Sequence, residues 1–262
     1  MSFNISREDI GGSNNKWGKR KDAVLNMLGV HTPAVIGLQE CSWTIRQDIL
    51  ASDSDLEAVG ISVYGNESGY TNESSNTIIY DGDLLEVQSS GTFWLSDTPD
   101  EVSETWGQWS EVEPKPRTCT WAEFKMKNSS AKGFYVFNAH IESDANIPDR
   151  YHAVKLILDK INEINTKGLP VIITGDHNDK ESDLSGYVGS DFTSARASAA
   201  VTDMDATLNG WGKDYDSGTD TVIDHIYTTG CTPKKFYVDR SRYNGRDYIS
   251  DHYPVICDLA IN

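Results

Sequence analysis

Short runs of apolar and β-branched residues recur along the chain, and several end abruptly in polar or charged side chains. The clearest run covers residues 171–173 and continues through Thr-Gly into Asp176, His177 and Asn178. Such a run predicts a buried strand. In an extended chain Asp176 and Asn178 point to one side and His177 to the other. Because α/β sheets bind ligands beyond the C-terminal ends of their strands, the pattern predicts a site here, although a polar turn would leave the same pattern.

Apolar spacing elsewhere predicts a chain that mixes strands with helices. Residues 17–28, 42–50 and 150–164 have helical spacing, with Ser42 as an N-cap. Residues 180–202 are polar and poorly periodic, which predicts a loop with a short helix. The other predicted strands cover residues 1–5, 34–38, 61–64, 76–80, 84–90, 118–126, 133–139, 222–227 and 255–260. The short strands among them indicate an antiparallel meander.

Several predicted strand ends carry side chains that are able to do chemistry. Glu40 follows an apolar strand, where a carboxylate is costly unless it is exposed, paired or bound to a metal. A Glu that helps to start the next helix is the alternative for this position. A single histidine such as His140 is more often a hydrogen-bonded structural group than a catalyst. The complete set of such side chains is Asn4, Glu40, His140, Asp176, Asn178, Asp224, Asp251 and His252.

Taken together, these residue types favour hydrolysis of a phosphate ester with the help of a hard metal ion. Glu40 and Asp251 offer oxygen ligands, which suit Mg²⁺, and no Cys/His cluster has the spacing of a zinc site. A histidine braced by a carboxylate can exchange a proton near neutral pH. Arg117 stands at the entrance of a predicted strand and could grip an anion with its guanidinium fork, or could be an ordinary surface arginine.

Composition supports one large core. The 262 residues are 38% hydrophobic and 24% charged, with no fixed-period repeat and no apolar run long enough to cross a bilayer. One or at most two domains are compatible with this length, and we expect a single domain over residues 1–262. The four cysteines lie far apart without C-x-x-C spacing, so we read them mainly as small buried hydrophobes with no disulfide indicated.

The net charge narrows the choice of partner. The chain has 23 basic and 40 acidic residues, a formal net charge of −17, which disfavours long nucleic acid because such binding depends on Lys and Arg. A small phosphorylated substrate held with a metal is compatible with that charge, and we expect a monomer. No secretory signal is present, yet a core strand at residue 1 is unusual, so a trimmed secreted form and a cytoplasmic form both stay open.

Six motifs along nearly the whole chain resemble the endonuclease/exonuclease/phosphatase superfamily, which has the deoxyribonuclease I-like fold. Residues 91–99 and 117–122 are similar to a bacterial branch of that superfamily known only as hydrolases. Each motif alone is weak, but six in the order of the family are highly specific. The motifs are Met1-Ser2-Phe3-Asn4-Ile5, Ile36-Gly37-Leu38-Gln39-Glu40, Phe137-Asn138-Ala139-His140, Gly175-Asp176-His177-Asn178, Ile223-Asp224-His225-Ile226 and Ser250-Asp251-His252-Tyr253-Pro254.

The resemblance implies an α/β fold: a four-layer sandwich in which two central, mostly antiparallel sheets are flanked by helices. It also implies a Mg²⁺ or Mn²⁺ site at one edge. Glu40 would bind the metal, with Asn4 beside it and Asp251 assisting. Asp176 would orient or deprotonate the attacking water.

The resemblance further implies how the phosphate is held. Asn178 would bind the phosphoryl group, and His140 and Arg117 would contact the substrate. His252, braced by Asp224, would hydrogen-bond the phosphate or act as acid/base. Whether Asp176 or His252 takes the proton stays open.

Two positions depart from the family pattern. His177 replaces a usual Phe, for which we favour packing, and Ala34 stands where an acidic residue often occurs.

The sequence leaves three candidate functions. We expect a phosphoesterase for a small or lipid-linked ester. The alternatives are a nuclease or exonuclease for short single strands and, suggested by 7 Trp and 12 Tyr, a secreted glycan-binding module without catalysis.

Overall fold

The computed structural model describes residues 1–262 except residue 72 and residues 107–114, 129–132, 144–146 and 214–220. Among the described residues, the strands form two six-stranded sheets. The first sheet has the order β11 (Cys231–Val238), β12 (Val255–Ile261), β1 (Ser2–Asn4), β2 (Val35–Gln39), β4 (Ile78–Asp81), β3 (Leu56–Val59). The second has the order β5 (Leu85–Trp94), β6 (Thr118–Met126), β7 (Phe134–His140), β8 (Val171–Asp176), β10 (Asp224–Thr229), β9 (Thr193–Ser194).

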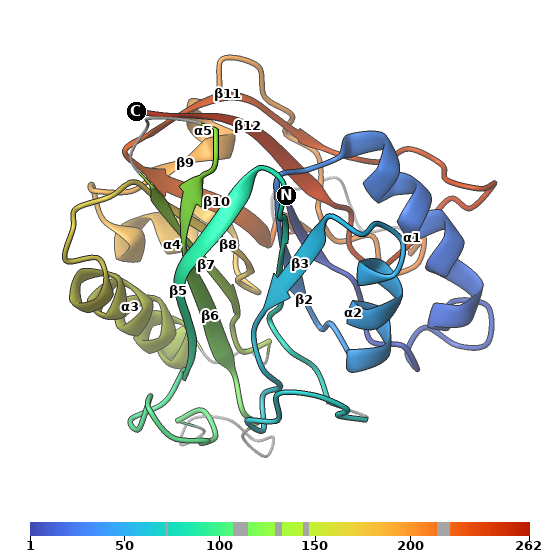
Figure 1. Ribbon diagram of the computed structural model, residues 1–262, viewed down its shortest axis with the longest axis horizontal. Helices are drawn as coiled ribbons and strands as arrows, with labels where there is room; N and C mark the ends of the chain where they lie inside the picture. Colours follow the sequence, from blue (N-terminus) through green and yellow to red (C-terminus); the bar gives the residue numbers. More distant parts are fainter. Residues whose placement is uncertain (72, 107–114, 129–132, 144–146, 214–220) are drawn as a thin grey trace.

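Helices cover the outer faces of both sheets (Figure 1). The helices are α1 (Trp17–His31), α2 (Trp43–Leu50), α3 (Ile147–Ile164), α4 (Glu181–Val188) and α5 (Ala195–Ser198). Apolar side chains of α1 and α2 pack on β1 and β2, while those of α3 pack on β7 and β8. Of the strand pairs in the described part of the chain, β1–β2 and β7–β8 are parallel and the others are antiparallel. The expected four-layer, mostly antiparallel sandwich is confirmed.

Most predicted elements are present, and the exceptions have local causes. The strand predicted at residues 61–64 is wrong: Ser62 accepts the backbone N–H groups of Tyr64 and Asn66, and Gly65 has a φ of 82°, so turn chemistry prevails. Strand β11 was not predicted because Pro233 and neighbouring lysines interrupt its apolar pattern. It lies at the edge of its sheet, where Pro and Lys are tolerated.

The structure also bears on the helix cap, the cysteines and the membrane expectation. Ser42 does cap α2, since its Oγ accepts the backbone N–H of Ile45 at 3.4 Å. All four cysteines are free, with Cys41 and Cys119 fully buried. No helix in the described part of the chain is long and apolar enough to cross a membrane.

A buried polar cluster joins the two sheets across the middle of the sandwich. The Nδ2 of Asn138, on β7, donates to the carbonyl oxygens of Leu38 at 2.8 Å and Thr77 at 3.1 Å. Its Oδ1 accepts from Gln39 Nε2 at 2.7 Å and from Thr174 Oγ1 at 3.1 Å. Buried amides that satisfy their donors and acceptors in this way hold a unique arrangement of the surrounding elements. We call this cluster the inter-sheet clasp.

The clasp also explains a glycine in β2. A Cβ at Gly37 would overlap Thr174 Oγ1 and lie 2.6 Å from Asn138 Oδ1. The backbone of β2 can approach the second sheet this closely only because position 37 has no side chain.

Replacing Gly37 with Ala should therefore destabilise the protein by about 1–3 kcal/mol, the usual cost of overpacking a core. Urea unfolding of the two proteins measures the difference. Gly29→Ala is the matched control, because Gly29 is exposed in α1 with no atom within 4 Å of the added Cβ. That substitution should leave stability equal or slightly higher. Equal unfolding midpoints for Gly37→Ala and the wild type would contradict the role of the clasp.

Candidate active site

Three neighbouring strands of the second sheet bring three predicted site residues to the same level. His140 ends β7, Asp176 ends β8 and Asp224 begins β10. The strand register pairs His140 with Asp176 and Asp176 with Asp224. These side chains are at least 93% buried, with exposed fractions of 7%, 1% and 1%. A row of neighbours in one sheet therefore forms one wall of the site.

The first sheet supplies the facing wall. Asn4 ends β1, and Glu40 directly follows β2, whose last residue pairs with Asn4. Glu40 has a φ of 57°, a left-handed conformation that is uncommon for a residue with a side chain and clusters at functional sites. The backbone N–H of Arg7 donates to Glu40 Oε2 at 3.2 Å, which fixes the carboxylate.

Asp176 lies at the centre of these groups. Its Oδ2 accepts from Asn4 Nδ2 at 2.9 Å and lies 3.5 Å from His140 Nε2 and 3.6 Å from His252 Nε2. Asn4 Nδ2 also lies 3.4 Å from Glu40 Oε1 and so links the two carboxylates. The structure thus brings five predicted residues from distant parts of the sequence into contact.

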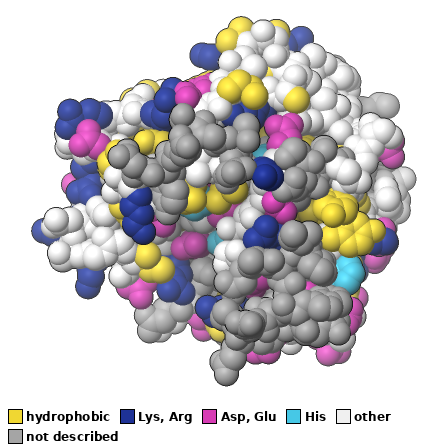
Figure 2. All heavy atoms as spheres, turned by 180° about the vertical axis from the view of Figure 1, so that it is seen from behind, with side chains coloured by type: hydrophobic (Ala, Val, Ile, Leu, Met, Phe, Trp, Pro, Cys, Tyr) yellow, Lys and Arg dark blue, Asp and Glu magenta, His cyan; other side chains and the backbone are white. Residues whose placement is uncertain are grey.

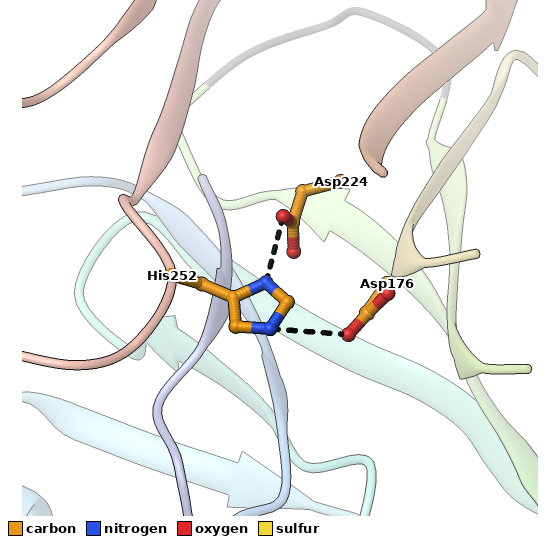
Figure 3. Close-up of side chains that lie close together, drawn as sticks. All are labelled: Asp176, Asp224 and His252. Carbon is orange, nitrogen blue, oxygen red and sulfur yellow. Dashed lines mark hydrogen bonds and ion pairs between the residues drawn. The ribbon is translucent and has the colours of Figure 1, made fainter. Parts of the chain in front are cut away.

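His252 is held between two carboxylates (Figure 3). Its Nδ1 lies 2.9 Å from Asp224 Oδ2, and its Nε2 faces Asp176. Ser250, on the same loop, accepts the backbone N–H of His252 at 3.3 Å and donates to the carbonyl oxygen of Asn4 at 2.7 Å. The loop before β12 is therefore tied directly to the end of β1.

The two histidines of the site have opposite electrostatic environments. Burial by itself lowers the pKa of His252, but the carboxylates of Asp224 and Asp176 outweigh burial and raise the pKa to about 10. Burial, with the positive charges of Arg117 and His252, holds the pKa of His140 well below its usual value. Burial raises the pKa of Asp176. The site therefore pairs a cationic imidazole with a neutral one.

Asn178 and Arg117 lie beside this cluster, but each already makes hydrogen bonds to another residue of the chain. The backbone N–H of Asn178 donates to Asp176 Oδ1 at 2.9 Å, and its Nδ2 donates to the carbonyl oxygen of Ile141 at 2.9 Å. Its φ of 50° ends the extended run after Asp176. The Arg117 guanidinium binds Glu142 through Nε at 3.4 Å and Nη2 at 3.1 Å. The fork expected to grip an anion is thus occupied by a carboxylate.

Asp251 precedes His252 on the loop before β12. Its Oδ1 is 3.2 Å from the Ser250 hydroxyl that also bonds the Asn4 carbonyl. His177 points away into packing: its ring lies 5.5 Å from that of His225 and 5.8 Å from that of Tyr227. The packing favoured for His177 is what the structure has.

Two groups of side chains have the composition of a metal site. Asp176, Asp224 and His252 offer ligand atoms within 4.8 Å of one another. Both nitrogens of His252 face carboxylates, however, and a doubly protonated imidazole has no lone pair for a metal. Glu40, Asn4 and Asp251 offer only oxygen donors, which Mg²⁺ and Mn²⁺ prefer.

Arg20 supports the site and was not predicted from the sequence. The side chain is fully buried in α1 and donates to the carbonyl oxygens of Ile5, Ser6 and Ile249, which flank Asn4 and the His252 loop. Its guanidinium lies 5.1 Å from the ring centre of Trp17. The available signal was that Arg20 lies three residues after Trp17 in the helical pattern, but this spacing did not identify its acceptors.

Tryptophans are largely committed to the protein interior. Trp17 and Trp94 are buried, and Trp94 Nε1 donates to the carbonyl oxygen of Val63 at 2.8 Å. Trp106 Nε1 donates to Asp97 at 2.6 Å. Trp109 lies outside the described residues. The aromatic residues that suggested a glycan-binding surface are thus mainly packing residues among those described.

Comparison with known proteins agrees with the fold and the motifs. Residues 1–252 match the model of the Endonuclease/Exonuclease/phosphatase family. The crystal structure of an endonuclease/exonuclease/phosphatase from Bacteroides vulgatus has a TM-score of 0.86 and 28% identity, covering 100% of this chain and 97% of that one. The mannosyl-6-phosphatase of Bacteroides thetaiotaomicron has a TM-score of 0.84 and 27% identity, covering 99% and 98%.

One further relative matches only part of this chain. An uncharacterised protein of Acanthamoeba polyphaga mimivirus is 27% identical over 164 residues, which is 62% of this chain and 59% of that protein's length. TDP2 of D. rerio, complexed with a single strand DNA product, has a TM-score of 0.75 at 16% identity, covering 99% of this chain and 97% of that one. The second likeness is one of fold alone.

Replacing Asp224 with Asn should lower the pKa of His252 by roughly one to three pH units, because an adjacent opposite charge stabilises the cation by that amount. NMR titration of the His252 imidazole in metal-free protein measures it. Asp239→Asn is the matched control, since Asp239 bonds a different histidine, His31, at 2.9 Å. An unchanged pKa of His252 in Asp224→Asn, or an equal fall in Asp239→Asn, would contradict the pairing.

Proposed function

Since the chain belongs to the endonuclease/exonuclease/phosphatase family, as its six motifs predict, we propose that it is a divalent-metal-dependent phosphoesterase. It hydrolyses a small phosphate ester by attack of an activated water. The observation that carries the proposal is the Asp176 carboxylate, which contacts Asn4, His140 and His252 at 2.9–3.6 Å beside Glu40. We also propose that residues 1–262 form one catalytic domain and act as a monomer.

The proposed metal ligands are Glu40, Asn4 and Asp251. Their oxygen atoms fit Mg²⁺ or Mn²⁺, and Glu40 is held in place by the Arg7 N–H and by Asn4. The bound ion would stabilise negative charge on the phosphoryl oxygens. Hydrogen bonds from neighbouring groups to a metal-binding carboxylate orient it and tune its basicity.

The chain's own residues then perform the proton chemistry. We assign acceptance of the water proton to Asp176, because both nitrogens of His252 already face carboxylates and carry protons. His252 donates to a phosphoryl oxygen, and Asp224 keeps its ring oriented and charged. His140 contacts another phosphoryl oxygen through Nε2. Asn178 and Arg117 line the rim, where Asn178 has one remaining amide N–H for substrate.

The relatives support a small ester over a polymer. A mannosyl-6-phosphatase is among the similar structures, which favours a phosphomonoester of a small alcohol. On the face drawn in Figure 2, the Lys and Arg side chains of the described residues lie in separate spots with acidic side chains between them. A long nucleic acid needs a more continuous basic surface.

A nuclease for short single strands is the second candidate, favoured by the family itself. A glycan-binding module without catalysis is the third and accounts least well for the buried Asp–His pairs. Hydrolysis of any phosphate ester, abolished by a chelator, separates the first two candidates from the third.

Glu40→Gln and His252→Ala should each lower Mg²⁺-dependent hydrolysis of 4-nitrophenyl phosphate or bis(4-nitrophenyl) phosphate by roughly a hundredfold or more, the scale of a lost electrostatic or acid/base group. EDTA should abolish turnover, and added Mg²⁺ or Mn²⁺ should restore it. Glu86→Gln, at an exposed position of β5, is the control and should retain the wild-type rate. Chelator-resistant turnover, or wild-type rates in Glu40→Gln, would refute the metal assignment.

Binding of a single-stranded DNA of about twelve nucleotides should depend weakly on salt, with a log–log slope shallower than about −2, because few phosphates are neutralised at roughly 0.7 each. Fluorescence anisotropy between low and physiological salt gives the slope. A slope of about −4 or steeper would instead support the nuclease candidate.

A further inference from the structure

A polar pocket of about 250 Å³ opens beside the proposed catalytic groups. Its lining includes Glu40 and His140 of the candidate site together with Tyr64, Glu73 and Lys115. This volume lies below the range of about 300–1,000 Å³ that is usual for drug-sized ligands. The pocket is therefore suited to one small group attached to a phosphate bound next to it.

The lining residues Val63, Tyr64, Glu73 and Ser74 lie on two stretches that are bonded to each other. Ser62 and Ser75 form a bridge, and the backbone N–H of Val63 donates to Ser74 at 2.9 Å. Asn66 Nδ2 donates to both oxygens of Glu73 at 2.9 and 3.0 Å, which orients that carboxylate. Preorganised side chains bind a ligand with a smaller entropic cost. These stretches thus hold Glu73 beside the pocket before any ligand arrives.

The lining offers both hydrogen-bond donors and hydrogen-bond acceptors. Glu73 is an acceptor with lone pairs left after its bonds to Asn66. Lys115 contributes an ammonium with three N–H donors, and Arg117 holds Glu142 through Nε and Nη2. Tyr64 is 52% exposed and presents both an aromatic face and a hydroxyl.

We propose that this pocket binds the alcohol part of the substrate, and that the alcohol is a polyhydroxyl group the size of a monosaccharide. The inference rests on the proposed phosphoesterase function. Hydroxyl groups donate and accept at once, so they match a lining that mixes a carboxylate, an ammonium and a phenol. The Tyr64 ring supplies an apolar face for the C–H side of a sugar ring.

Other small esters fit this lining less well. An alkyl or lipid chain would meet only Ile10, Val63 and Pro116 as apolar partners and would leave the charged groups desolvated and unpaired. A nucleobase usually stacks on aromatic side chains, and Tyr64 is the one aromatic residue that lines the pocket among the described residues. The pocket should discriminate more strongly against an alkyl ester than against a nucleotide, because an alkyl group would bury polar side chains without partners.

The test compares kcat/KM for glucose, mannose and galactose 6-phosphates with hexyl phosphate and AMP, using 4-nitrophenyl phosphate as the common reference. The best hexose phosphate should exceed hexyl phosphate and AMP by at least roughly tenfold. Glu73→Gln and Tyr64→Ala should each lower the ratio of hexose phosphate to 4-nitrophenyl phosphate on the order of tenfold, the effect of one lost polar or packing contact. Glu86→Gln should leave that ratio unchanged. Preference for hexyl phosphate or AMP, or an unchanged ratio in both pocket variants, would overturn the proposal.

A binding measurement separates this proposal from the proposed function. Calorimetry with the His252→Ala protein and Mg²⁺ should give tighter binding of the hexose phosphate than of inorganic phosphate by roughly tenfold, and adding Glu73→Gln should remove the difference. If the wild type hydrolyses no ester, the phosphoesterase function fails, yet tighter binding would still support the pocket. Equal affinities for the two ligands would overturn the pocket assignment even in an active enzyme.

Discussion

The two sheets are held in register by one buried amide. Asn138 uses both donors and its acceptor oxygen on groups of the opposite and neighbouring strands, so any sliding of one sheet over the other would leave several buried polar atoms unpaired. His140 and Asp176 lie two residues beyond the clasp members Asn138 and Thr174, and Glu40 directly follows Gln39. The separation of the sheets at the clasp therefore sets the distance across the active site, and the apolar core alone would permit a looser arrangement.

The two histidines of the site have different charged neighbours, and this difference gives them different chemical roles. His252 lies between Asp224 and Asp176, whereas His140 has one carboxylate neighbour and a guanidinium nearby. Two imidazoles that would titrate alike in water thus take different protonation states inside one cleft. A neutral and a cationic donor can then serve different oxygens of one phosphoryl group. His140 and Asp176 end their strands and Asp224 begins its strand, while the loop before β12 places His252 between the two carboxylates.

The fold could be predicted because six short motifs resemble the family, and the same motifs contain the residues that the structure brings together around Asp176. Polar residues after apolar strands identified Asp176 and Glu40, and strand alternation identified the packing of His177. The bonds of Asn178 and Arg117 to protein partners could not be predicted, because they depend on a left-handed residue and on Glu142, which are close only in the folded chain. Arg20 was missed for the same reason: its acceptors are backbone carbonyl groups, which carry no residue-specific signal.

The pairing of β1 with β12 joins an early and a late segment of the sequence in one sheet. Ser2 lies opposite Val255, and Ser250 bonds the carbonyl of Asn4. A chain still emerging from the ribosome can form β7 and β8 before the loop that carries His252 has been made. Contacts between such distant segments form late and slowly. The candidate site would therefore be assembled only after β12 has been synthesised and has taken its place beside β1.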